Sequence, residues 1–141
     1  MHALPAAPYP MLSAAASNSV VQKYKEKILL GIPTFGIDYT KTGNRYQKRV
    51  MHAADGILLT QKNHTGSQFN EETRTPFVQY SVGNTRNTER HIVHYEDARS
   101  ISEKFDLLDR AGLGGINIMS LEYDAPVLWQ ILNQRYTIQK Y

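Results

Sequence analysis

The stretch His91–Leu121, HIVHYEDARSISEKFDLLDRAGLGGINIMSL, decides the fold that this sequence predicts. It is typical of a strand, a helix and a second strand joined by short loops. The first strand, His91–Tyr95, is rich in β-branched and aromatic residues. The second, Gly115–Leu121, is mostly apolar, as strands buried in parallel sheets are. A right-handed crossover is the expected geometry of such a unit.

The helix of this unit has a recognisable beginning and end. Asp97 can accept hydrogen bonds from the free N–H groups of the first turn. Gly112 can take the left-handed conformation that ends a helix, so that Leu113 folds back on Leu108. Three apolar residues at spacings of four and three share one face: Ile101, Phe105 and Leu108. The sequence therefore predicts an amphipathic helix between Asp97 and Gly112.

Length and composition indicate a globular chain of one ordinary domain. Of its 141 residues, 41% are hydrophobic and 21% are charged. No stretch approaches the roughly 20 apolar residues of a membrane helix. The absence of cysteine excludes disulfides and thiolate zinc sites. Residues 1–21 lack a basic region before their apolar stretch, so we expect no signal peptide and no recognisable targeting signal.

A second apolar run, Ile28–Ile32, ends at Pro33 and also predicts a buried strand. We expect this run and Ile116–Leu121 to lie in one parallel sheet. The residues between them are far more than a crossover helix requires. The sequence therefore predicts that something is inserted between the two strands.

The inserted segment is expected to form a small α+β unit whose strands are mostly antiparallel. Thr75–Val82 and Glu89–Tyr95 flank a polar segment and are expected to form a hairpin. Its other expected elements are a polar turn region at Tyr39–Tyr46, a short helix at Gln47–Asp55, and strands at Ile57–Thr60 and Ser67–Asn70. Outside the insert, we expect helices at Met11–Lys25 and Ala125–Gln134 and a short strand or extension at Tyr136–Lys140.

Four segments of this sequence resemble the C-terminal part of a glycoside hydrolase family 18 catalytic domain. Lys27–Thr40 is similar to the seventh barrel strand and its following turn, and Phe69–Tyr80 to strands of the α+β insertion. Gly112–Leu121, with the later Trp129, resembles the eighth strand and final helix. His91–Ser100 is similar to the most specific motif of the bacterial branch that acts on spore-cortex or cell-wall peptidoglycan.

The resemblance implies an α/β fold, a partial (β/α)8 TIM barrel with an inserted α+β subdomain. Residues 1–36 and 97–141 would form the last two strands and helices of the barrel, and residues 37–96 the insertion. A complete barrel takes about 250 residues, so this chain would hold only part of one. Its implied partners are the missing N-terminal half of the barrel and a polysaccharide that contains N-acetylglucosamine, either peptidoglycan or chitin. The implied location is the spore, the cell wall or the extracellular space.

The chemistry implied by the resemblance is substrate-assisted hydrolysis. One carboxylic acid, at the end of an Asp-x-x-Asp-x-Asp-x-Glu motif on the fourth strand, protonates the leaving oxygen. None of the 13 acidic residues here has that spacing. Glu103, Asp106 and Asp109 follow the spacing of a solvent-facing helix side. We therefore expect no catalytic residue, no metal and no cofactor in this chain, and no activity from the chain alone.

Six residues are candidates for contact with a sugar: Phe35, Tyr39, Glu96, Arg99, Met119 and Glu122. Met119 stands where the family commonly has a tryptophan beneath the cleaved sugar, and Phe35 where a tyrosine is common. Both differences imply weaker or altered sugar binding. Glu96 is expected either to offset the helix dipole or to contact sugar hydroxyls, and Arg99 to pair with Glu96 or to point to the ligand.

Other functions are compatible with the residues. The chain could be a non-catalytic carbohydrate- or cell-wall-binding module, or a remnant without function. A partial barrel exposes a sheet edge and apolar strand faces, which predicts marginal stability or self-association. The basic segment Lys41–Arg49 could attract anionic wall polymer, but a solvated loop is the expected role, and a net charge of +3 does not favour nucleic acid.

Two further observations bear on possible sites. His91 and His94 are three residues apart on a predicted strand, so they project to opposite faces and cannot bind one metal ion. Trp129 lies in the last predicted helix, and we expect it to pack in the core or in the barrel wall.

Overall fold

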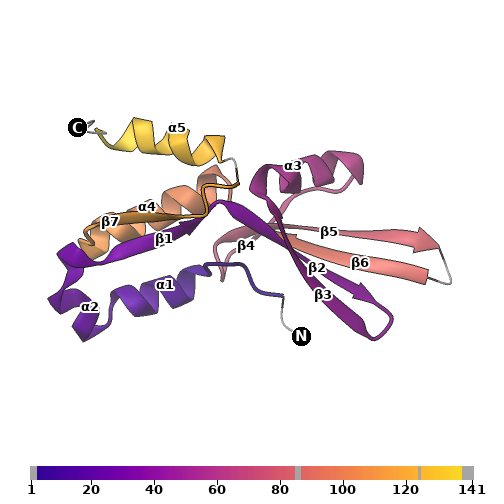
Figure 1. Cartoon of the computed structure of the whole chain (residues 1–141), viewed down its shortest axis with the longest axis horizontal. Coiled ribbons are helices and arrows are strands. Elements are labelled where there is room, and N and C mark those ends of the chain that lie inside the picture. Colours follow the sequence, from indigo (N-terminus) through magenta and orange to yellow (C-terminus); the bar gives the residue numbers. More distant parts are fainter. Residues whose placement is uncertain (1–2, 85–86, 124, 138–141) are drawn as a thin grey trace.

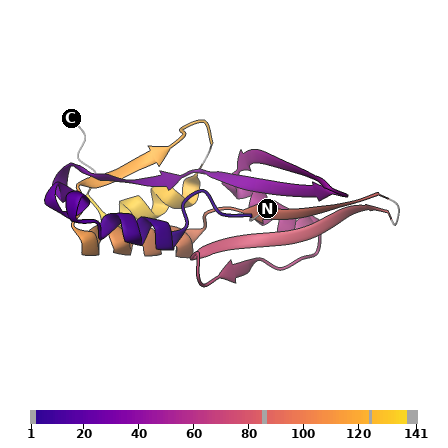
Figure 2. The same ribbon diagram turned by 90° about the horizontal axis from the view of Figure 1, so that it is seen from below.

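The computed structural model describes residues 3–84, 87–123 and 125–137 and places two sheets end to end (Figure 1). Helices gather around a short parallel sheet at one end, and long antiparallel strands extend to the other end (Figure 2). In chain order the elements are α1 (Tyr9–Ala16), α2 (Ser19–Lys23), a 3₁₀ turn (Lys25–Lys27), β1 (Leu29–Pro33), β2 (Phe35–Thr42), β3 (Arg45–His52), α3 (Ala53–Lys62), β4 (Gln68–Asn70), β5 (Thr75–Asn84), β6 (Asn87–His94), α4 (Ala98–Ala111), β7 (Gly115–Met119) and α5 (Pro126–Arg135).

The parallel sheet consists of β1 and β7, and this pairing confirms the expectation from the two apolar runs. Its register sets Leu30 beside Ile116 and Ile32 beside Ile118. One face packs on α4 and α5, where the buried core is made by Leu30, Ile32, Ile101, Phe105, Leu108, Leu128 and Ile131. Removing these apolar side chains from water stabilises this end of the molecule.

The antiparallel sheet has the strand order β3-β2-β6-β5-β4, and α3 covers part of one face. Beneath α3 lies a second core of Met51, Ala53, Val78, Val93 and Tyr95. Gly56 lets α3 approach closely, because a Cβ atom there would lie 2.5 Å from the Tyr95 ring. The predicted hairpin is confirmed, since β5 and β6 pair from Phe77 and His94 to Asn84 and Asn87.

The predicted crossover unit of His91–Leu121 is wrong. β6 pairs with β2 and β5, whereas β7 pairs with β1 in the other sheet. A strand that is followed by a helix and a second strand need not share a sheet with that second strand. Here β6 already has neighbours on both edges, one of them supplied by a local hairpin, and no edge is left for a parallel partner.

Helix α4 ends as its sequence predicts. The Asp97 carboxylate accepts a hydrogen bond from the Ser100 N–H at 2.8 Å, and the Ser100 hydroxyl accepts one from the Asp97 N–H at 2.9 Å. Gly112 has φ +63°, and the Leu113 N–H donates to the Leu108 carbonyl at 3.2 Å. These bonds satisfy backbone groups that helix ends otherwise leave unpaired.

Several local predictions are wrong in the insert. Residues 47–52 continue β3 instead of forming a helix, because they pair with β2 from a two-residue turn at Gly43-Asn44. Gly43 has φ +57°, which suits glycine at the first position of such a turn. The expected polar turn region is therefore mostly strand. Residues 57–60 belong to α3 and form no strand, whereas the strand expected at 67–70 is confirmed as β4.

The termini also differ from expectation. The predicted helix at residues 11–25 is divided into α1 and α2, because Asn18 caps a new helix by accepting from the Val20 N–H at 2.9 Å. The helix expected at residues 125–134 is confirmed as α5. The terminal strand predicted at 136–140 falls mostly outside the described residues. Within the described chain, no helix has the length and apolar character needed to span a membrane.

Candidate functional site

The carboxyl ends of β1 and β7 lie side by side, and Thr34 holds them together. Its N–H and its hydroxyl donate to the Met119 carbonyl at 3.3 and 2.9 Å, and its hydroxyl also contacts the Ser120 carbonyl. Ser120 has φ +74°, a conformation that non-glycine residues rarely adopt. Such strained positions gather at functional sites, and ligands of open α/β sheets bind at the carboxyl ends of the strands.

An aromatic cluster of Phe35, His52 and Tyr123 lies at the same edge. Phe35 and His52 are cross-strand neighbours at the start of the β2–β3 pair. The Tyr123 ring lies 6.0 Å from that of Phe35 and 5.0 Å from that of His52, tilted against both. The cluster therefore joins the loop after β7 to the antiparallel sheet, and it offers ring surfaces of the kind that pack on sugars.

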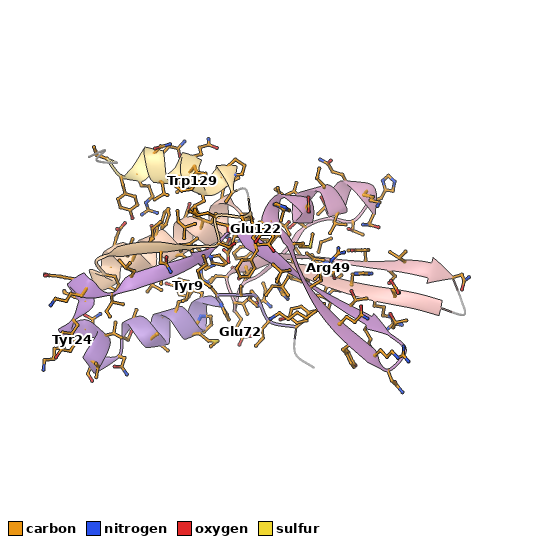
Figure 3. All side chains as sticks on the ribbon, in the orientation of Figure 1. Tyr9, Tyr24, Arg49, Glu72, Glu122 and Trp129 are labelled. Atoms are coloured by element: carbon orange, nitrogen blue, oxygen red, sulfur yellow. The ribbon has the colours of Figure 1, made fainter. Side chains whose placement is uncertain are left out.

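Met119 and Glu122 belong to this edge as well. The Met119 sulfur lies over Gly31, where a Cβ atom would be only 2.8 Å from it. Met119 is 36% exposed and Leu121 is 79% exposed. Figure 3 shows Glu122 where the two sheets meet. Of the six predicted contact residues, Phe35, Met119 and Glu122 are the ones that the fold brings to the carboxyl edge.

The predicted role of Glu96 as a capping or sugar-facing carboxylate does not fit its environment. Glu96 is buried, and its carboxylate accepts from the Lys104 ammonium at 2.6 Å, with 4% and 0% of the two side chains exposed. Burial raises the pKa of Glu96, while Lys104 and a hydrogen bond from Ser100 act in the opposite direction. Lys104 holds the Glu96 carboxylate inside the fold, next to the start of α4.

A small cavity of about 120 Å³ borders Glu96. It is lined mainly by apolar residues of α3, α5 and the end of β1, including Ile57 and Val127. Trp129, on α5, is 41% exposed. Packing of Trp129 in the core, one of the two expected alternatives, is therefore wrong for this structure, whereas its packing in a barrel wall stays a prediction.

Arg99 and Tyr39 lie away from the carboxyl edge. Arg99 pairs with Glu71 at 2.7 Å and with Glu103 at 3.3 Å, so the expected pair with Glu96 is wrong. Its guanidinium also lies 3.6 Å from the centre of the Phe69 ring. The Tyr39 hydroxyl donates to the Leu4 carbonyl at 2.9 Å and so holds the N-terminal segment against the antiparallel sheet.

His94 binds the same N-terminal segment. Its Nε2 lies 3.1 Å from the Ala3 carbonyl and donates to it, while its buried Nδ1 has no partner in the described structure. Burial lowers the pKa of His94. The opposite projection of His91 and His94 was predicted correctly from their spacing: His91 contacts Asp38, on the other face of the sheet.

Sequence reasoning missed His52, Tyr123 and Lys104. Tyr123 lies two residues beyond the end of a predicted strand, and that position was the available signal. His52 reaches the edge only through its register with Phe35. Lys104 lies three residues after Ile101 and four before Leu108, so helical spacing places it on the apolar face of α4, and that spacing was the available signal. Among the residues that the structure describes, no three His, Asp or Glu side chains gather as metal ligands.

The chain matches the sequence model of the glycosyl hydrolases of family 18 over residues 9–124. The cortical fragment-lytic enzyme of Bacillus subtilis (strain 168) is 30% identical over 116 residues, which is 81% of this chain and 26% of that protein. The cortical fragment-lytic enzyme of Bacillus anthracis is 29% identical over 118 residues, which is 82% of this chain and 26% of that protein.

Solved structures agree with this match. The crystal structure of the spore cortex-lytic enzyme SleL of Bacillus megaterium QM B1551 superposes with a TM-score of 0.85 at 26% identity, covering 100% of this chain and 33% of that one. SleL of Bacillus cereus gives a TM-score of 0.82 at 26% identity, covering 98% of this chain and 32% of that one. The chain thus spans about a quarter to a third of the length of these relatives.

Proposed function

Because this chain belongs to family 18 of the glycosyl hydrolases, we propose that it forms one wall of the sugar-binding groove of a longer glycosidase. The polymer contains N-acetylglucosamine and is peptidoglycan or chitin. In this proposal β1 and β7 are two neighbouring strands of a (β/α)8 barrel, and the antiparallel sheet with α3 is an inserted subdomain. Its relatives include enzymes named for lysis of spore cortex.

The observation that carries the proposal is the one-sided parallel sheet. One face of β1 and β7 packs on α4 and α5. The opposite face carries Leu29, Gly31, Asn117 and Met119, and Leu29 is 55% exposed there. In the described structure no third strand pairs with either β1 or β7. Parallel sheets are normally covered on both faces, so we infer that further barrel strands cover this face.

The proposed sugar contacts lie at the carboxyl edge. Tyr123 and Phe35 offer ring surfaces, and Met119 offers a thioether where a flat ring would bind a sugar more strongly. Exposed polar groups there, Glu122 among them, are available to sugar hydroxyls. Glu96 and Arg99 have protein partners, so they take a structural role in this proposal.

Catalysis requires a carboxylic acid that protonates the leaving oxygen, and the proposed sugar contacts at the carboxyl edge do not supply it. The buried Glu96 carboxylate is already engaged by the Lys104 ammonium, at 2.6 Å. We propose that the general acid lies on another barrel strand. In this proposal the chain positions the sugar, and the purified 141-residue chain does not cleave it.

Two measurements test this function. The chain should not hydrolyse a chromogenic N-acetylglucosaminide alone. It should gain that activity when co-expressed with the N-terminal two thirds of a related spore cortex-lytic enzyme. Turnover by the chain alone would refute the assignment of the acid to another strand. Failure of every complementing partner, with a soluble complex in hand, would argue against the barrel-wall role.

A binding measurement tests whether the sugar binds at the carboxyl edge or elsewhere on the surface. Tyr123→Ala should weaken binding of N-acetylchitobiose to the chain about three- to tenfold by calorimetry, the value of one aromatic contact. Tyr24→Ala is the matched control, because Tyr24 is exposed beside α2, far from Glu122 and the carboxyl edge (Figure 3). Equal effects of the two variants would remove the edge as the sugar site.

A further inference from the structure

A fixed histidine lies on the face of the antiparallel sheet that carries α3. The Nδ1 atom of His91 is 3.0 Å from both carboxylate oxygens of Asp38 and 3.2 Å from the Thr40 hydroxyl. Asp38 is 3% exposed. The Tyr80 ring stacks on the imidazole at 4.5 Å with an angle of 3° between the planes. With Nδ1 occupied, Nε2 is the ring nitrogen left to face outward, 3.8 Å from Glu89.

A hollow of about 560 Å³ opens over this histidine. Beside it lies a second hollow of about 480 Å³, bordered by α3 through Leu58 and Gln61. Arg49 and Tyr80 line both hollows, so the two meet as one groove that crosses the sheet alongside α3. Figure 3 shows Arg49 below α3, on the sheet. In the described chain the Arg49 guanidinium makes no ion pair, and it borders the centre of the groove.

The side chains of the groove favour an uncharged polar chain. Its charged lining residues are three cations and three acids: Lys48, Arg49, Lys62, Asp38, Asp55 and Glu89. Nucleic acids and anionic polymers need an excess of cations, which this lining lacks. Planar polar groups, namely a guanidinium, an imidazole and two side-chain amides at Gln47 and Gln61, can instead hydrogen-bond hydroxyl and acetamido groups.

We propose that this groove is a second binding site for a neutral N-acetylated polysaccharide chain, separate from the carboxyl edge. The proposal rests on the function proposed above, because it takes as ligand the uncharged one of the two polymers named there, chitin. The two sites lie on opposite faces of the sheet: Phe35 alternates along β2 with Asp38 and Thr40, whose side chains point to the α3 side. An extended polymer can thus be held by the insertion outside the groove of the barrel.

The test compares two arginines on the two faces of the same sheet. Arg49→Ala removes the guanidinium at the centre of the groove. Arg90→Ala is the control, since Arg90 is exposed and alternates with His91 on β6, which places it on the opposite face. Both variants lose one positive charge. Affinity for N-acetylchitohexaose is measured by calorimetry on the full chain, and the His91 ring resonances are followed by NMR.

We expect Arg49→Ala to weaken hexaose binding about tenfold, the effect of losing a hydrogen bond to a charged group, and Arg90→Ala to weaken it less than twofold. The His91 resonances should shift on addition of hexaose, also in the Tyr123→Ala variant. A single-stranded oligonucleotide that binds more tightly than the hexaose would overturn the ligand class.

Other outcomes separate the two proposals. Hexaose binding that is weakened by Tyr123→Ala but equal in the two arginine variants would overturn the groove and leave the carboxyl edge standing. Unchanged His91 resonances at saturating hexaose would do the same. If the unaltered chain binds neither hexaose nor chitobiose, both the groove and the proposed function fall.

Discussion

Replacing Lys104 by methionine should be among the most damaging single changes in this chain. The side chains of Lys104 and Glu96 are 0% and 4% exposed, and their charged atoms are 2.6 Å apart. Lys104→Met keeps the volume and the apolar stem but leaves a carboxylate buried without its partner. Breaking a buried pair in this way costs about 3–5 kcal/mol, which is a factor of about a hundred to several thousand in the unfolding equilibrium.

The loss should depend on pH. Burial raises the pKa of Glu96 above its ordinary value of 4.5, and Lys104 lowers it, so the substitution raises it further. A carboxyl whose pKa is higher in the folded state contributes stability below its unfolded pKa and loses it as pH rises through the folded pKa. We therefore expect the destabilisation by Lys104→Met to be small near pH 4 and to grow toward neutral pH.

Urea denaturation followed by far-ultraviolet circular dichroism measures both effects. Arg99→Met is the control, because Arg99 is 49% exposed in its ion pair with Glu71, and exposed ion pairs contribute little to stability. The double variant Glu96→Gln, Lys104→Met should recover part of the lost stability, since no charge is left buried. The reasoning is refuted if Lys104→Met at pH 7.5 destabilises no more than Arg99→Met does.

Three further predictions concern stability. Gly114→Ala should destabilise the fold by about 1–3 kcal/mol or more in a thermal melt, because the added Cβ would lie 2.0 Å from the Glu26 carbonyl oxygen. Gly66→Ala is the control and should be nearly neutral, since a Cβ there meets no atom within 4 Å. Equal melting temperatures of the two variants would contradict this prediction. Asp97→Ala should cost about 0.5–2 kcal/mol in urea by removing the cap of α4, and an unchanged midpoint would be the contrary result. Since burial lowers the pKa of His94, the stability that neutral His94 contributes is complete above the ordinary pKa of 6.5 and is lost as pH falls. The fall in unfolding free energy below pH 6.5 should therefore be smaller in His94→Gln. An identical pH profile of the two proteins would exclude His94 as the cause.

Local patterns predicted the elements whose hydrogen bonds are local. The cap at Asp97, the left-handed Gly112 and the apolar face of α4 were all legible in the chain, because a helix end depends on residues within a few positions. The pairing of β1 with β7 was also predicted, since two continuous apolar runs are typical of parallel strands. In the insert the same approach failed: β3 is mostly exposed and polar, and its pairing with β2 determines its conformation.

The candidate site was predicted only in part for a related reason. Phe35 and Met119 follow or end predicted strands, so position along the chain placed them at the carboxyl edge. Glu96 and Arg99 differ, because both are near the start of α4 and only the packing decides that Glu96 turns inward to Lys104 while Arg99 turns outward to Glu71. A buried ion pair needs two groups brought together by tertiary structure, and neither residue type indicates burial by itself.

By itself the sequence determined the family, the ends of α4 and the two strands that form the parallel sheet, because each depends on residues that are close in the chain or on a motif of fixed spacing. Only the tertiary structure decided which sheet β6 joins, the burial of Lys104 against Glu96, and the stacking of Tyr80 on His91 beside Asp38. These contacts join residues far apart in sequence, and their energies depend on burial and register, which are properties of the folded chain as a whole.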